Sequence, residues 1–244
     1  MSMIRVLYRR ELAAYFATPL GYVFIVIFLV ASNAFTFYLG GFYERNQADL
    51  EPFFVFHPWL YLLLVPAISM RTWAEERKTG TIELLLTLPI TMWQAVLSKF
   101  LAAWTFVAIA LALTFPLWLT VNYLGEPDNG VILAAYLGSL LMAGGYLAIG
   151  ICMSAATRNQ VVAFILSLVV CFVFTLSGYP LVLDAFRGWL PVGLTELIAS
   201  LSFLTHFQSI SKGVLDLRDL VYFLVMIVAW LYASAIVIDM KKAD

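Results

Sequence analysis

The chain has 244 residues, of which 63% are hydrophobic and 12% are charged, and its mean hydropathy is +0.94. A soluble domain of this length exposes too much surface to be covered by so few polar side chains, so the composition excludes a soluble enzyme and a disordered chain. The net charge of −1, from 14 basic and 15 acidic side chains, excludes a nucleic-acid-binding module. A polytopic membrane protein remains.

The N-terminal segment predicts an amphipathic helix over residues 3–18. Apolar residues recur at helical spacing from Ile4 to Phe16, and Arg5 and Arg9 fall between them. We expect this helix to lie in the cytoplasmic interface with its arginines toward lipid headgroups, the alternative being a simple extension of the first span. The uncharged run that follows is far longer than a signal-peptide core, so we expect it to be a retained span.

Six uncharged stretches are each long enough for one membrane helix, which needs about 20 apolar residues, and none is comfortably long enough for two. The sequence therefore predicts an all-α, multi-pass membrane protein with a single transmembrane domain over residues 1–244. The predicted spans are residues 20–42, 53–72, 98–123, 131–156, 160–182 and 219–239. With six spans, the side that holds both termini carries ten basic and six acidic residues, and the opposite side carries four and nine. The excess of basic residues predicts that both termini are cytoplasmic.

The loop over residues 73–90, between the second and third spans, is the most informative part of the chain. Gly80 can end one helix in a left-handed conformation, and Gly80 or Thr81 can begin another, with Glu83 favoured in its first turn by the helix dipole. The result is a short, nearly all-apolar helix at about residues 82–88. Such a helix needs a cover, which a neighbouring helix, the membrane surface or a partner protein could supply. The alternative is an interfacial loop helix with no partner.

Two other segments carry packing or topological signals. The fourth span contains small residues four apart, in the pairs Ala134/Gly138, Gly144/Ala148 and Gly150/Ser154. These let helix backbones approach closely, and we expect packing within the bundle, with a dimer seam as the alternative. Residues 184–216 are too long and too apolar for an ordinary loop, so one or two re-entrant helices are expected before the last span.

The sequence offers little for catalysis. It contains no phosphate-binding G-x-x-x-x-G-K-[ST], no H-E-x-x-H and no G-x-S-x-G. Cys152 and Cys171 lie in apolar runs, and we expect them to be small buried residues. We therefore expect no catalytic residue, bound cofactor or metal in this chain.

The interiors of the predicted spans hold no Asp, Glu, Lys or Arg, which disfavours an ion-coupled carrier. Asn33 and Thr36 are the main polar groups of the first span. They either line a pathway or form hydrogen bonds between helices. A pathway with such walls suits a lipid-like, amphipathic or polypeptide-linked cargo better than a small ion.

Two strings resemble a known family. Residues 75–90, EERKTGTIELLLTLPI, look like the coupling-helix region of ABC-2 type permeases, whose fold is also that of type V exporters. Residues 205–223, THFQSISKGVLDLRDLVYF, are similar to the segment before the last span in one branch of that family, and they include His206, Asp216, Arg218 and Asp219. That branch contains the gliding-motility permeases and the nitrous-oxide-reductase maturation permeases.

The resemblance implies a permease domain over residues 1–244 in the bacterial inner membrane. It implies a second permease subunit, the same or a related chain, and two separate ATPase subunits that bind ATP and Mg²⁺, with an accessory membrane or periplasmic protein in many cases. The residues carried over as the ATPase contact are Glu75, Glu76, Arg77, Lys78, Gly80, Thr81 and Glu83. The expected function is to export a substrate, or to transmit ATPase motion to a partner. A non-transporting membrane scaffold is the alternative.

Overall fold

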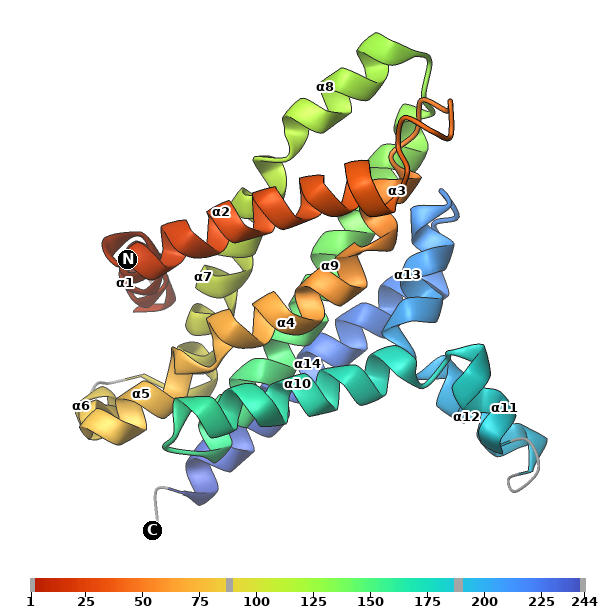
Figure 1. The fold of residues 1–244 in the computed structure, drawn as a ribbon. Coiled ribbons are helices and arrows are strands. Elements are labelled where there is room, and N and C mark those ends of the chain that lie inside the picture. The colour runs from red at the N-terminus through yellow and green to blue at the C-terminus, as the bar shows by residue number, and fades with distance from the viewer. Residues whose placement is uncertain (1–2, 87–89, 187–190, 242–244) are drawn as a thin grey trace.

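The computed structural model describes residues 3–86, 90–186 and 191–241, and within these ranges every regular element is a helix (Figure 1). The all-helical architecture agrees with the predicted polytopic membrane protein. Four helical stretches in the described part of the chain are long and apolar enough to cross a membrane, namely Pro19–Leu39, Met92–Leu124, Asn129–Ala156 and Leu217–Met240. The remaining two predicted spans coincide with shorter helices, so the number six stays a prediction.

The first helix, α1 (Met3–Ala17), corresponds to the predicted amphipathic segment and packs lengthwise on α7 (Met92–Ala112). Leu7 is buried in this contact, and the Tyr15 ring stacks on Phe106 with 5.0 Å between centroids. Arg5 and Arg9 are exposed on the other side. One face of α1 therefore belongs to the bundle, and its arginines remain available to the surroundings.

The next helices form a long arm and a bent rod. Helix α2 (Pro19–Ala34) begins at a proline, which has no N–H to lose in a first turn, and continues into a π-helical turn, Phe35–Leu39. The predicted second span is not a single helix, because the chain forms α3 (Glu51–Val55), α4 (His57–Ser69) and α5 (Arg71–Thr79). We call these three helices together the bent rod. Proline at the start of α4 and Pro66 inside it remove backbone donors, which bends the rod.

Helix α9 (Asn129–Ala156) is the centre of the bundle. It packs against α4, α7, α10 (Gln160–Leu176), α13 (Phe203–Ser211) and α14 (Leu217–Met240). A Cβ added at Gly150 would lie 1.9 Å from Ser69 Oγ of α4, and one at Gly138 would lie 2.7 Å from Ile210 Cγ2 of α13. The predicted packing role of the small residues is therefore confirmed inside the bundle, where close helix approach leaves no room for larger side chains.

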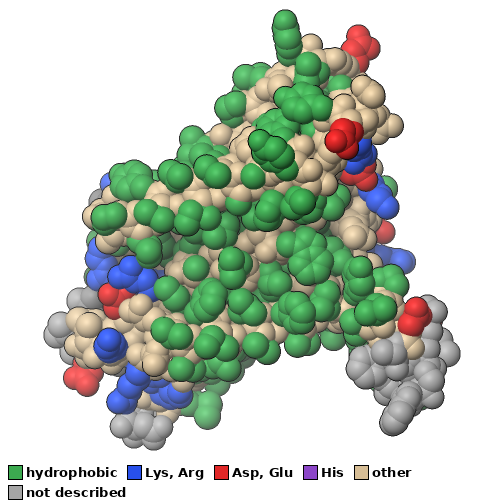
Figure 2. Space-filling view, in the orientation of Figure 1, with side chains coloured by type: hydrophobic (Ala, Val, Ile, Leu, Met, Phe, Trp, Pro, Cys, Tyr) green, Lys and Arg blue, Asp and Glu red, His purple; other side chains and the backbone are tan. Residues whose placement is uncertain are grey.

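Three further helices lie at the end of the molecule opposite to α5 (Figure 1). They are α8 (Phe115–Leu124), α11 (Pro180–Phe186) and α12 (Val192–Ser200), and α11 and α12 project from the bundle (Figure 1). The predicted outer segment 184–216 thus contains α12 and α13. Hydrophobic side chains cover the middle of the face shown in Figure 2, and charged side chains gather toward its two ends, as a protein surrounded by lipid requires.

Candidate functional site

A charged turn and a short helix project at the end of the bent rod. Helix α5 ends at Gly80, whose φ of +75° lies in the left-handed region, and α6 (Thr81–Leu86) begins at the next residue. The prediction that Gly80 ends a helix in this conformation is confirmed. A Cβ at Gly80 would meet nothing within 4 Å, so the backbone conformation, and not packing, requires glycine there. Residues 87–89 of the predicted short helix lie outside the described residues.

The seven predicted contact residues fall into two groups. Lys78, Gly80, Thr81 and Glu83 are exposed and form what we call the tip. Glu75, Glu76 and Arg77 are half-buried on α5, and we call them the root. The structure therefore does not bring all seven together on one free surface.

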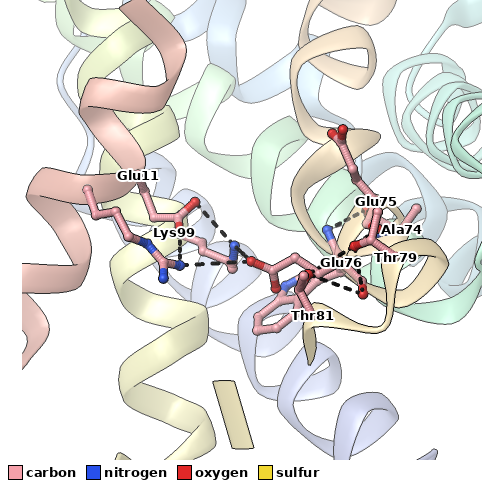
Figure 3. Close-up of polar contacts among 10 residues, drawn as sticks. Glu11, Ala74, Glu75, Glu76, Thr79, Thr81 and Lys99 are labelled. Atoms are coloured by element: carbon pink, nitrogen blue, oxygen red, sulfur yellow. Dashed lines mark hydrogen bonds and ion pairs between the residues drawn. The ribbon is translucent and has the colours of Figure 1, made fainter. Parts of the chain in front are cut away.

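Glu76 of the root belongs to an ion network that joins three helices (Figure 3). Lys99 of α7 is only 4% exposed, and its Nζ lies 2.7 Å from Glu76 Oε1 and 3.2 Å from Glu11 Oε2 of α1. Arg10 lies 2.5 Å from Glu11, and the Lys99 ammonium stands 5.1 Å from the centroid of the buried Trp73 ring. Burial raises the pKa of the Glu11 carboxyl, but the positive charges of Lys99 and Arg10 outweigh it and hold that pKa below its ordinary value.

Arg77 fastens the root to the end of α9. Its Nη1 donates to the carbonyl oxygen of Ala155 at 2.7 Å, and its Nη2 donates to that of Lys241 at 3.5 Å. Lys241 Nζ in turn donates to the carbonyl oxygen of Ala156. The last carbonyls of a helix have no partner within it, and cations satisfy them and complement the negative end of the helix dipole.

Ser154 of α9 makes the second attachment of α5. Its Oγ accepts hydrogen bonds from the backbone N–H groups of Trp73 and Ala74, both at 3.0 Å, and donates to the carbonyl oxygen of Met70 at 2.8 Å. Met70 lies between α4 and α5, so one hydroxyl of the central helix holds the junction of the rod. The sequence predicted only a packing role for Ser154, from its spacing to another small residue. Its hydrogen bonds to the junction of α4 and α5 were not predicted.

The Glu75 carboxylate is paired with Arg71 of the same helix, α5. Arg71 Nε donates to Glu75 Oε2 at 2.9 Å, and Arg71 Nη2 donates to Oε1 at 3.1 Å, the spacing of four residues placing both on one face. The hydrogen bond from Arg71 lowers the pKa of the Glu75 carboxyl. The tip therefore extends from a root whose charged side chains are all engaged.

At the opposite end, the second motif forms a clip between helices. His206 Nδ1 lies 2.6 Å from Asp219 Oδ1, its Nε2 lies 2.9 Å from the carbonyl oxygen of Ser200, and its ring stacks on Tyr222 at 3.9 Å. Asp216 caps α14 by accepting from the N–H of Arg218 at 3.0 Å. These contacts hold α12 and α13 on the start of α14, while the Arg218 side chain is exposed.

The two polar residues of the first span, Asn33 and Thr36, both form hydrogen bonds to the backbone of their own helical arm. Asn33 Nδ2 donates to the carbonyl oxygen of Leu29 at 2.7 Å, and Thr36 Oγ1 donates to that of Ser32 at 2.6 Å, all within the same helical arm. Asn33 borders a shallow groove of about 430 Å³ on α2, whereas Thr36 is fully buried. Both hydrogen bonds stay within the arm, and a pathway-lining role for Asn33 and Thr36 stays a prediction.

Among the residues that the structure describes, no three His, Cys, Asp or Glu side chains are grouped so that they could hold a metal ion. Cys152 and Cys171 are both buried and unpaired, as expected from their surroundings. His57 is buried with its Nδ1 2.7 Å from Ser139 Oγ.

A family model described as ABC-2 family transporter protein matches residues 34–240, which include the rod, the tip and the clip. Comparison with curated proteins gave no match. Since the family model covers most of the chain, this membrane protein belongs to the ABC-2 family of transporter proteins.

Proposed function

We propose that this chain is the permease subunit of an ATP-driven ABC-2 transporter, which exports a substrate or passes ATPase motion to a membrane or periplasmic partner. ATP and Mg²⁺ would be bound by a dimer of separate ATPase chains, and a second permease, the same or a related chain, would complete the membrane part. Family membership supports this assignment, and the sequence of residues 205–223 supports the branch of gliding-motility and nitrous-oxide-reductase maturation permeases.

The observation that carries the proposal is the contrast between tip and root. The tip exposes Lys78, Thr81 and Glu83, and the last two belong to α6, whose sequence is otherwise apolar. Charged and polar groups beside apolar residues have the composition of a small docking surface. The root is held to α7 by Glu76 and to α9 by Arg77. A force applied to the tip would therefore move α5 together with α4 and the end of α9, as a packed unit that shifts without deforming.

The topology that fits this role has six spans in the bacterial inner membrane, with the tip and both termini in the cytoplasm. Helix α4 has 13 residues and α10 has 17, but α4 continues into α5 through Met70, whose N–H still bonds to the carbonyl oxygen of Pro66. The bent rod, rather than α4 alone, provides the length of the second span.

Charge reversal on the tip tests the proposal. The chain is purified with the ATPase that copurifies with it, and ATP hydrolysis is compared with that of the free ATPase. Glu83→Arg is expected to reduce stimulation several-fold, because a like charge opposed at an interface rim weakens association. Glu126→Arg, an exposed charge reversal next to α8 at the opposite end, is the matched control and should leave stimulation unchanged.

A passive scaffold predicts a different result. It would bind its partners without altering ATP hydrolysis, so that Glu83→Arg and Glu126→Arg would behave alike. Recovery of no nucleotide-hydrolysing partner from intact membranes would also reject the proposal.

A further inference from the structure

His206 of α13 lies between two hydrogen-bond acceptors, at the end of the bundle opposite to the tip (Figure 1). Its Nδ1 is 2.6 Å from Asp219 Oδ1, and its Nε2 is 2.9 Å from the carbonyl oxygen of Ser200. A neutral imidazole carries one N–H group, and neither a carbonyl oxygen nor an ionised carboxylate can donate. These two contacts therefore require one proton more than a neutral ring beside an ionised carboxylate supplies.

The surroundings of the ring favour placing this proton on His206 and leaving Asp219 ionised. Asp219 is in the first turn of α14, where the positive end of the helix dipole stabilises a carboxylate. Ser200 is the last residue of α12, so its carbonyl group belongs to the negative end of that helix. The Tyr222 ring stacks on the imidazole with 3.9 Å between centroids, and the face of an aromatic ring attracts a cation. All three neighbours thus favour the imidazolium form.

Among the described residues, the titratable groups that touch the His206 ring, Asp219 and Tyr222, both come from α14. Helices α9 and α10, which also pack on α13, contain no Asp, Glu, Lys, Arg or His, and their tyrosine hydroxyls bond Thr114 and Thr175. Charged side chains near this end of the other neighbouring helices are exposed, namely Glu51, Glu196, Asp216 and Arg218. The charge state of the clip is therefore decided by His206 and Asp219.

We propose that the clip is proton-dependent: the imidazolium of His206 fastens the C-terminal end of α12 to α14, and loss of one proton loosens α12. The proton leaves from Nε2, because the neutral ring retains the stronger hydrogen bond, which runs from Nδ1 to the Asp219 carboxylate. The Nε2 lone pair then faces the carbonyl oxygen of Ser200, and two acceptors oppose each other. The side chains of His206 and Asp219 are 16% and 10% exposed, which lets the proton pass to the solvent.

The link between α12 and α13 stays attached when the proton leaves. Tyr222 OH donates to the carbonyl oxygen of Leu201, and Ser202 Oγ donates to that of Thr175 at 3.1 Å. The change is therefore confined to α12, which projects from the bundle (Figure 1). The inference goes beyond the proposed function, because a proton-dependent clip in the permease alone requires neither an ATPase nor transport.

Counting the protons on the ring tests the proposal. The full-length chain with nitrogen-15-labelled histidine is purified in detergent and studied by NMR from about pH 5 to pH 9, which spans the range where histidine ordinarily changes charge. The chain holds two histidines, and His206→Gln identifies the signals of His206. The ring should lose its second proton at a higher pH in the parent than in Asp219→Asn, because the carboxylate stabilises the imidazolium.

Asp216→Asn is the matched control for this titration. It removes an exposed carboxylate from the same end of α14 and keeps the helix cap, since Asn caps a helix as well as Asp does. Its His206 ring should titrate as in the parent. Loss of the proton at the same pH in the parent and in Asp219→Asn would overturn the proposal.

The mobility of α12 tests the mechanical part of the proposal. A spin label at Glu196→Cys, on the exposed side of α12, should become more mobile over the pH range in which the ring loses its proton. The same label combined with His206→Gln, and a label at Glu126→Cys next to α8, should show no such change. A label on α12 whose mobility stays constant while the ring loses its proton would reject the proton-dependent clip, whatever the ATPase measurements show.

Discussion

The charge of Lys99 lies inside the bundle because two carboxylates from other helices meet it. Taking a charge out of water is costly unless its partners are close and well placed, and Glu11 and Glu76 lie 3.2 and 2.7 Å away. The sequence shows Lys99 as a lone base beside an apolar run, which is a signal for a buried pair but does not identify the partners. The three residues come from α7, α1 and α5, so a single ammonium connects α1 to the root.

Removing the Lys99 ammonium should lower the stability of the folded protein. Lys99→Met is expected to destabilise the protein by about 3 kcal/mol, because Glu11 and Glu76 are then left close together with no buried cation between them. Thermal unfolding of the purified chain in detergent measures the effect as a lower midpoint. The triple variant with Lys99→Met, Glu11→Gln and Glu76→Gln should recover much of the loss, and a single variant as stable as the parent would contradict the network.

The same network predicts a dependence on acid. The pKa of Glu11 is lower in the folded protein than its ordinary value of 4.5, so its ion pairs stabilise the fold fully above pH 4.5. That contribution is lost as the pH falls through the depressed folded value, where the carboxyl is protonated. Between pH 5 and pH 3 the midpoint of thermal unfolding should fall by less in Glu11→Gln than in the parent protein. The midpoint is measured at steps of about one pH unit. If the midpoint falls equally with pH in both proteins, Glu11 does not contribute to the loss of stability in acid.

Among the helices, the attachment of α5 to α9 decides how motion can pass through the molecule. Ser154 bonds three backbone groups around the junction of α4 and α5, and Arg77 bonds the carbonyl of Ala155 on the same helix end. Because α9 contacts most of the bundle, a displacement of α5 reaches the other helices through it. The tip projects beyond these attachments, and Thr81 Oγ1 at the start of α6 lies 3.0 Å from Thr79 Oγ1 at the end of α5.

Substitution of this hydroxyl tests the attachment. Ser154→Ala removes a partner from two N–H groups and one carbonyl, which should cost about 1–3 kcal/mol and increase amide hydrogen exchange over residues 71–79. Ser167→Ala is the matched control, because the buried Ser167 Oγ bonds only the carbonyl oxygen of Ala163 on its own helix. Exchange over α5 that rises equally in both variants would show that Ser154 does not hold the junction.

For the protein as a whole, the two ends of the bundle differ in what they present. One end carries α1, the tip and the C-terminal end of α14, and the other carries α8, the projecting α11 and α12, and the His206 clip (Figure 1). The exposed apolar side chains between them, such as those along α10, would be a liability in water and are suited to lipid. From the positive-inside rule we propose that the end with the tip is the cytoplasmic one.

Labelling from one side of the membrane tests this orientation. The native Cys152 and Cys171 are buried, so background reaction with a membrane-impermeant maleimide should be low. In intact cells Glu126→Cys should react, while Lys78→Cys should react only after the membrane is opened. If Lys78→Cys reacts in intact cells, the tip faces the outside of the membrane and cannot contact a cytoplasmic ATPase.

Consecutive residues were enough to predict the membrane class, the helical content, the left-handed Gly80 and the packing role of the small residues in α9. These features depend on local hydrophobicity, on backbone preference and on side-chain size, all of which can be read along the chain. The bends of the rod were not predicted as breaks, although Pro58 and Pro66 were visible, since neighbouring helices decide whether a proline bends or ends a helix.

The division of residues 75–83 into tip and root came only with the folded chain. In the sequence, Glu75, Glu76, Arg77 and Lys78 form one charged run with nothing to distinguish its members. In the structure, Glu76 meets a base 23 positions away, and Arg77 meets a carbonyl 78 positions away. Which charges stay free for a partner depends on contacts between distant helices, and such contacts leave no local pattern.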